Sequence, residues 1–216
     1  MALSDRRKGQ VDERLVLRHP PSAPIAAVLL LPGGRADGLR PPPPVDVAAL
    51  RMRPFGRAVL RALRPRPVCV AYLRYRRRGW NGDRADAARD AREALAVLRE
   101  RAGDVPVVLL GHSMGGRAAL RVAGDPAVRG VVALAPWCPP ADPVGHLAGR
   151  RLFLLHDEAD RVTSAQESWD FVRRARAVGA DATGVRMPVG GHAMLRGAGL
   201  WHGRAADLVA RLVDGG

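Results

Sequence analysis

The stretch from Val105 to Arg117, VPVVLLGHSMGGR, constrains the fold more than any other part of the chain. Its apolar run, Val105 to Leu110, is too short for a helix and rich in β-branched residues, which is typical of a buried strand. The residues Arg117 to Val122 are helix formers without a breaker. The stretch therefore predicts a strand, a tight turn and a helix in immediate succession.

Ser113 stands at the apex of the predicted turn, between Gly111 and Gly115. A turn this sharp crowds the backbone, and these glycines remove side chains that would collide with the neighbouring strand and helix. The Ser113 hydroxyl is thereby pushed into the open. In a chain with 24 glycines the pattern also arises by chance, so its meaning depends on the strand, the helix and the partners around it.

The length of 216 residues fits one domain with a sizeable core. We expect a flexible N-terminus over 1–10 and a single domain over 11–216. The formal net charge is +14, and Lys8 is the only lysine among the 35 basic residues. Because the arginines are scattered and only 4% of the residues are aromatic, we expect no nucleic-acid partner and attribute the arginines to a GC-rich coding bias.

Two cysteines, Cys69 and Cys138, lie in or beside apolar runs and lack metal-ligand spacing, so we expect buried free thiols and no metal. The residues Met1 to Gln10 are charged, and no apolar run reaches the length of a membrane span. These observations predict a cytoplasmic protein without a membrane partner, as a monomer or homodimer.

Strand-like and helix-like patterns alternate along the whole chain. Strands are expected at 12–18, 25–31, 67–73, 105–110, 128–135, 151–156 and 185–188, and helices at 47–63, 83–101, 117–122, 164–178 and 201–213. Pro54 is expected to interrupt or kink its helix. The alternation predicts a parallel sheet covered by helices on both faces.

A serine hydroxyl is a poor nucleophile until a base takes its proton, and six histidines compete for that role. His192 is the best candidate because it follows the last expected strand on a glycine loop, Gly190-Gly191, that lets it reach across the sheet. His112 adjoins Ser113 and is expected to point away from it. The remaining four are less suited by their positions: His19, His146, His156, which closes a strand as a structural histidine, and His202.

The base needs a carboxylate that fixes its tautomer and stabilises its charged form. Asp160 is the candidate, in the loop after the strand at 151–156. Asp157 and Glu158 lie too near the end of that strand, and Asp142 is the reserve. The chain order is nucleophile, acid, base, which is the order of hydrolases with this strand–turn–helix arrangement.

With these residues, the chain resembles a serine hydrolase of the α/β-hydrolase superfamily, in particular a small esterase or dienelactone-hydrolase-like member. The likeness runs from about residue 11 to the C-terminus and is most specific at 111–116, 156–160 and 191–192. It implies an α/β fold with a mostly parallel, twisted sheet, helices on both faces and little or no lid. It also implies that Ser113 is the nucleophile, Asp160 the acid and His192 the base.

The resemblance further implies an oxyanion hole formed by the backbone N–H groups of Met114 and of a residue in the turn after the strand at 25–31. Gly34 is the second donor that we expect, with Arg35 or Gly33 as replacements. The chain departs from the family pattern in two places. Pro32 precedes Gly33 where many members have histidine, and Asp157 stands where many have glycine.

The segment of some 15 residues between the strands at 128–135 and 151–156 is where relatives insert a helical lid, so an open pocket is expected. A serine at the turn argues against haloalkane dehalogenase or epoxide hydrolase chemistry, which uses aspartate there. It argues equally against a dienelactone hydrolase proper, which uses cysteine.

The function that these residues predict is hydrolysis of a carboxylic ester, or a related acyl bond, through an acyl-enzyme on Ser113. The substrate is a small acyl compound, and no cofactor is needed. Arg35, Met114, Trp137 and Met194 are candidates to line the pocket. Two alternatives remain: a thioesterase, with the arginines of 74–78 binding the phosphates of an acyl carrier, and a non-catalytic binding protein on the same fold.

Overall fold

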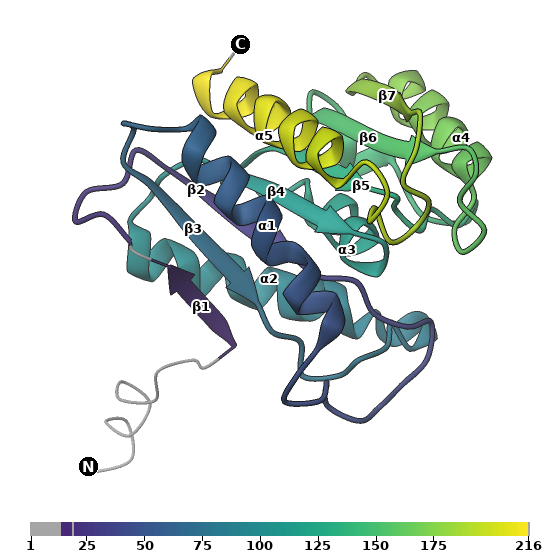
Figure 1. Ribbon diagram of the computed structural model, residues 1–216, viewed down its shortest axis with the longest axis horizontal. Coiled ribbons are helices and arrows are strands. Elements are labelled where there is room, and N and C mark those ends of the chain that lie inside the picture. The colour runs from purple at the N-terminus through teal and green to yellow at the C-terminus, as the bar shows by residue number, and fades with distance from the viewer. Residues whose placement is uncertain (1–13, 19, 216) are drawn as a thin grey trace.

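The computed structural model describes residues 14–18 and 20–215, and the expected flexible segment 1–10 lies outside them (Figure 1). Within the described residues, seven strands form one sheet in the order β1-β3-β2-β4-β5-β6-β7. Neighbouring strands are parallel, except that β1 runs antiparallel to β3. The strands are β1 (Leu15–Arg18), β2 (Ala26–Leu31), β3 (Val68–Leu73), β4 (Val107–His112), β5 (Val128–Leu134), β6 (Arg151–Asp157) and β7 (Asp181–Met187).

Helices cover both faces of the sheet, which confirms the predicted architecture. The helices α1 (Val47–Ala62) and α5 (Ala198–Asp214) lie on one face (Figure 1). The opposite face is covered by α2 (Asp86–Ala102), α3 (Met114–Val122) and α4 (Ala165–Ala177). Two short 3₁₀ turns are η1 (Gly82–Arg84) and η2 (Gly145–Leu147). None of the helices in the described ranges combines the length and apolar character that a membrane span requires.

The central strands are buried on both faces, which explains their uninterrupted apolar sequences. Leu29 and Leu109 pack toward α2, α3 and α4, whereas Val28 and Leu110 pack toward α1 and α5. From β2 the chain proceeds to β3 on one side, and from β4 it proceeds to β5 on the other. The carboxyl ends of β2 and β4 therefore flank the point where ligands bind in sheets of this kind.

Two expectations about individual elements need correction. The helix α1 runs unbroken through Pro54, so the predicted interruption is wrong. Proline removes one backbone hydrogen bond, but Met52, Phe55 and Val59 of the same helix are buried against the sheet. The strand β7 begins at Asp181, four residues before its expected start. It is an edge strand with half-exposed residues, so it carries only a weak apolar pattern.

The segment between β5 and β6 contains no lid domain. All residues of 135–150 are described, and their helical content is the single turn η2. Arg117 of α3 fastens this segment, because its Nε and Nη2 each lie 2.7 Å from a carboxylate oxygen of Asp142. Its guanidinium also stacks between the rings of Trp80 and Trp137, at 3.9 and 4.2 Å from their centroids. The expected absence of a lid is confirmed.

Close packing of α3 against β2 depends on Gly115. A Cβ added there would lie 2.3 Å from the backbone oxygens of Leu31 and Pro32. Gly111 has the same constraint, since its Cβ would lie 2.3 Å from the carbonyl oxygen of Gly115. Backbone atoms cannot move aside as a flexible side chain can, so any larger residue would push α3 away from the sheet.

We predict that Gly115→Ala lowers the free energy of unfolding by about 1–3 kcal/mol or more, because the added methyl overpacks a rigid contact. The matched control is Gly203→Ala on the exposed side of α5, where an added Cβ meets nothing within 4 Å. That change should stabilise the protein by roughly 0.5–1 kcal/mol. Urea unfolding of both variants tests the packing, and equal stabilities would contradict it.

Candidate active site

Ser113 joins β4 to α3 in a backbone conformation that side chains rarely adopt, with φ 55° and ψ −119°. Such a conformation costs about 1–3 kcal/mol and persists only where the surroundings enforce it. Three hydrogen bonds do so: the Ser113 N–H donates to the Leu134 carbonyl at 3.0 Å, and the Ser113 carbonyl accepts from the N–H groups of Arg117 and Trp137 at 3.1 and 3.2 Å. The serine is thereby fixed at the carboxyl end of the sheet.

The structure brings together Ser113, His192 and Asp160. The Nε2 atom of His192 lies 3.0 Å from Ser113 Oγ, and its Nδ1 lies 2.8 Å from Asp160 Oδ2. An ionised carboxylate only accepts hydrogen bonds, so Nδ1 carries the proton and Nε2 is left to accept from the hydroxyl. The arrangement can move a proton from serine to histidine while the carboxylate stabilises the resulting charge.

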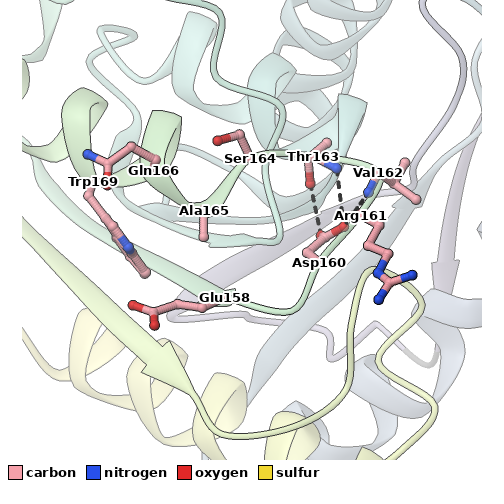
Figure 2. Close-up of a pocket in the computed structure, with 9 residues that line it drawn as sticks. All are labelled: Glu158, Asp160, Arg161, Val162, Thr163, Ser164, Ala165, Gln166 and Trp169. Atoms are coloured by element: carbon pink, nitrogen blue, oxygen red, sulfur yellow. Dashed lines mark hydrogen bonds between the residues drawn. The ribbon is translucent and has the colours of Figure 1, made fainter.

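Both oxygens of the Asp160 carboxylate are occupied. Oδ1 accepts from the backbone N–H groups of Val162 and Thr163 at 2.7 and 3.1 Å, and Figure 2 shows Asp160 turned toward these two residues. Oδ2 accepts from His192 Nδ1, from Thr163 Oγ1 at 3.0 Å and from His156 Nε2 at 3.2 Å. Burial raises the pKa of this carboxyl, but the bonds from His156, His192 and the backbone outweigh it and hold the pKa well below its usual 3.8. Asp160 is therefore ionised at neutral pH.

The loop that carries His192 is tied down on two sides. Asp157 Oδ2 accepts from the Gly191 N–H at 2.7 Å, and His112 Nε2 lies 2.9 Å from the His192 carbonyl oxygen. Gly190 and Gly191 have φ values of 141° and 55°, which give the loop its turn after β7. Sequence reasoning set Asp157 aside as the acid and missed its role as a support. Its position at the end of β6, beside β7, was the available signal.

His112 is nearly inaccessible, with 1% of its surface exposed. Burial, and to a smaller extent the nearby His192, lowers the pKa of His112 to about 3. The ring is therefore neutral, its Nε2–H donates to the His192 carbonyl, and its Nδ1 is buried against Gly33 without a partner. His112 serves as a packing neighbour of His192, with ring centroids 4.9 Å apart.

The turn after β2 lies beside Ser113. A Cβ on Gly33 would lie 3.5 Å from Ser113 Cβ, and one on Gly34 would lie 2.3 Å from the Met114 side chain. Met114 is the first residue of α3, so its N–H has no partner within the helix. Among the described residues, the Gly34 N–H makes no hydrogen bond, whereas the Arg35 N–H donates to the Arg78 carbonyl at 2.9 Å. Arg35 is thus excluded as a replacement donor.

The candidates for lining the pocket differ in their surroundings. Met194 is 2% exposed and packs in the core between the sheet, α1 and α5. Arg35 is exposed in the loop after β2, and Trp137 is half-buried against Arg117. Met114 has 1% of its surface exposed. Asp142, the alternative candidate for the acid, accepts two hydrogen bonds from the Arg117 guanidinium.

A hollow of about 630 Å³ lies beside the loop that carries Asp160 (Figure 2). Its lining includes Asp160 and Thr163 but neither Ser113 nor His192; the residues are Glu158, Asp160, Arg161, Val162, Thr163, Ser164, Ala165, Gln166 and Trp169. Within 14–18 and 20–215, no group of three or more histidine, cysteine or acidic side chains is placed to hold a metal ion.

Comparison with solved structures reveals related folds. An α/β serine hydrolase without a lid from Xanthomonas campestris superposes with a TM-score of 0.64 at 18% identity, covering 91% of this chain and 88% of that one. An esterase domain from Rhodothermus marinus gives 0.63 at 19% identity, covering 91% and 92%. An esterase from Pyrococcus furiosus gives 0.66 at 16% identity, covering 88% and 84%. At these identities the likeness establishes the fold.

No curated protein matches the sequence. The family model described as the alpha/beta hydrolase fold matches residues 67–175, which span β3 to α4 and include Ser113 and Asp160. Together with the sheet order and the strand–turn–helix at Ser113, this match shows that the chain belongs to the α/β-hydrolase fold family.

Proposed function

We propose that the protein is a serine hydrolase that cleaves a carboxylic ester of a small acyl compound through an acyl-enzyme on Ser113. The observation that carries the proposal is the pair of contacts made by His192, at 3.0 Å to Ser113 Oγ and 2.8 Å to Asp160 Oδ2. The structural likeness to esterases from Rhodothermus marinus and Pyrococcus furiosus supports this class of reaction.

In the first step, His192 Nε2 takes the proton of Ser113 as the serine oxygen attacks the ester carbonyl. Asp160 accepts from Nδ1 and stabilises the imidazolium that forms. Because its pKa lies well below the usual range, Asp160 stays ionised and does not take the proton itself. The charge on His192 is therefore stabilised while the tetrahedral intermediate exists.

The negative oxygen of that intermediate would be bound by the N–H groups of Met114 and Gly34, each contributing about 3 kcal/mol to the transition state. His192 then gives its proton to the leaving alcohol, and the acyl group remains on Ser113. Water enters, loses a proton to His192 and attacks the acyl carbonyl. Its attack releases the carboxylic acid and restores the serine.

The arginines of 74–78 raised the alternative of a thioesterase that binds carrier phosphates. Arg76 contacts the carboxylates of Asp90 at 2.6 Å and of Glu93 at 2.5 Å. Arg77 lies 3.8 Å from the Asp86 carboxylate. These two guanidinium groups thus have carboxylate partners within the fold, and the ester remains the proposed substrate.

We predict that Ser113→Ala lowers kcat on nitrophenyl esters by at least about 10³-fold, because the variant has no atom that can form the acyl-enzyme. A panel of esters with increasing acyl length, assayed on wild type and variant, measures the loss. Ser22→Ala, at an exposed serine, is the matched control and should retain wild-type turnover. If Ser113→Ala retained it too, the proposal would be wrong.

We predict that Asp160→Asn lowers kcat by about 10³ to 10⁴-fold, since an amide leaves the imidazolium without its anion and favours the wrong tautomer of His192. Circular dichroism of the variant checks that it folds. Asp207→Asn, at an exposed carboxylate of α5, should have no effect on turnover. A comparable loss in that control would mean that the assay reports general damage.

The same variant should change how stability depends on pH. Because the pKa of Asp160 is lower in the folded protein than its ordinary 3.8, the unfolded chain binds the proton more readily. The ionised Asp160 carboxylate therefore stabilises the fold at pH values above 3.8, the ordinary pKa of the group. This contribution to the free energy of unfolding is lost as the pH falls below 3.8 toward the lower pKa of the folded protein. Urea unfolding between about pH 5 and about pH 3 should show a shallower decline for Asp160→Asn than for wild type; parallel declines would contradict the assignment.

A further inference from the structure

A second imidazole contacts the Asp160 carboxylate. His156, near the end of β6, has no exposed side-chain surface, and its Nε2 lies 3.2 Å from Asp160 Oδ2. That oxygen is also the one to which His192 Nδ1 is bonded. None of the steps described above uses His156, although it contacts the same carboxylate oxygen as His192.

The partners of His156 determine where its own proton resides. The Asp160 carboxylate cannot donate, so Nε2 carries a hydrogen that points at Oδ2. On the other side of the ring, Nδ1 lies 2.8 Å from the hydroxyl oxygen of Ser168, which is fully buried. The Ser168 hydroxyl can therefore donate to Nδ1. A ring that donates from Nε2 and accepts at Nδ1 satisfies both contacts.

Thr163 cannot replace this donor. Its Oγ1 lies 3.0 Å from Asp160 Oδ2, 3.1 Å from His192 Nδ1, 3.3 Å from His156 Nε2 and 3.2 Å from the Ala135 carbonyl. A hydroxyl has a single proton, shared here between the carboxylate and the carbonyl. His156 Nε2 has the carboxylate oxygen at 3.2 Å and the Thr163 hydroxyl at 3.3 Å, and the charged oxygen is the stronger acceptor.

We propose that His156, with its tautomer set by the Asp160 carboxylate and its Nδ1 hydrogen-bonded to Ser168, is a positioning residue for the hydrolysis proposed above. Its Nε2–H fixes the Asp160 carboxylate and shares Oδ2 with His192. The proposal rests on the proposed function, since its effect is transmitted through the acid and base assigned there.

Two effects follow from removing the Nε2–H. The carboxylate loses a restraint on its orientation, so it holds the His192 ring less well aligned to take the Ser113 proton. In the resting enzyme, Oδ2 is no longer shared and attracts the charged form of His192 more strongly. The titratable groups that contact His192 are Asp160, beneath Nδ1, and His112, beside the ring; both are unchanged by the substitution.

The test compares His156→Leu, which removes the donor, with His156→Gln, whose amide N–H can occupy the place of Nε2. For His156→Leu we expect kcat to fall about tenfold, equivalent to 1.4 kcal/mol, with little change in KM. The acid limb of the profile of kcat/KM against pH should move to higher pH. His156→Gln should restore most of both. The matched control is His146→Gln, in the turn η2, whose Nε2 contacts the Leu120 carbonyl away from the site; it should behave as wild type.

If His156 had a purely structural role, His156→Leu would lower the free energy of unfolding but leave the acid limb of the kcat/KM profile at the same pH. An unmoved limb in a folded His156→Leu variant, or a His156→Gln variant no better than leucine, would overturn the proposal. If His156→Leu does not fold, Ser168→Ala takes its place. That variant keeps the ring but removes the hydroxyl that is hydrogen-bonded to Nδ1, and the acid limb of its pH profile should move in the same direction by a smaller amount.

A readout without substrate separates this proposal from the proposed function. The proton on His192 Nδ1, hydrogen-bonded to Asp160, should give a resolved downfield signal in the proton NMR spectrum, and that signal should shift in His156→Leu and return in His156→Gln. If the wild type cleaves no ester but the signal moves this way, the function is wrong and the positioning role stands. A signal insensitive to both variants overturns the positioning role in an active enzyme as well.

Discussion

The strained turn at Ser113 is the constraint on which the rest of the site depends. A residue with φ 55° and ψ −119° stays in that conformation because β5 and the segment after it accept and donate backbone hydrogen bonds on both sides of the serine. The turn requires α3 to begin against the end of β2, and that approach requires glycine at 115. The same approach brings the turn at Gly33 and Gly34 beside the serine, so one packing contact positions the candidate nucleophile and the candidate oxyanion donors together.

The other half of the site consists of residues that follow β6 and β7, and the Asp160 carboxylate connects them by hydrogen bonds. Asp160 accepts hydrogen bonds from two backbone N–H groups, two imidazoles and a hydroxyl, which keeps an ionised group stable where its side chain has no exposed surface. Asp157 and His112 fix the backbone on either side of His192. His192, the candidate base, is thus positioned by contacts from the ends of β4 and β6, although it lies on a glycine-containing loop.

Much of this arrangement was predictable from sequence, because its signals are local. The apolar runs of β2 and β4 and the glycines around Ser113 predicted the fold. The chain order singled out Ser113, Asp160 and His192, which the structure brings together. The supports of the site were not predictable, since His112, Asp157 and His156 act through contacts between separate loops. The interruption predicted at Pro54 was wrong for a related reason, because tertiary packing keeps this residue inside a helix.

The central claim is that an acyl group becomes attached to Ser113 during turnover. Mixing the enzyme with a slowly deacylating nitrophenyl ester, quenching in acid and measuring peptide masses tests it most directly. The account predicts one acyl group on the peptide that contains Ser113, formed as fast as the first burst of nitrophenolate and lost as the acid is released. Turnover without such an adduct, or with the acyl group on a different residue, would contradict it.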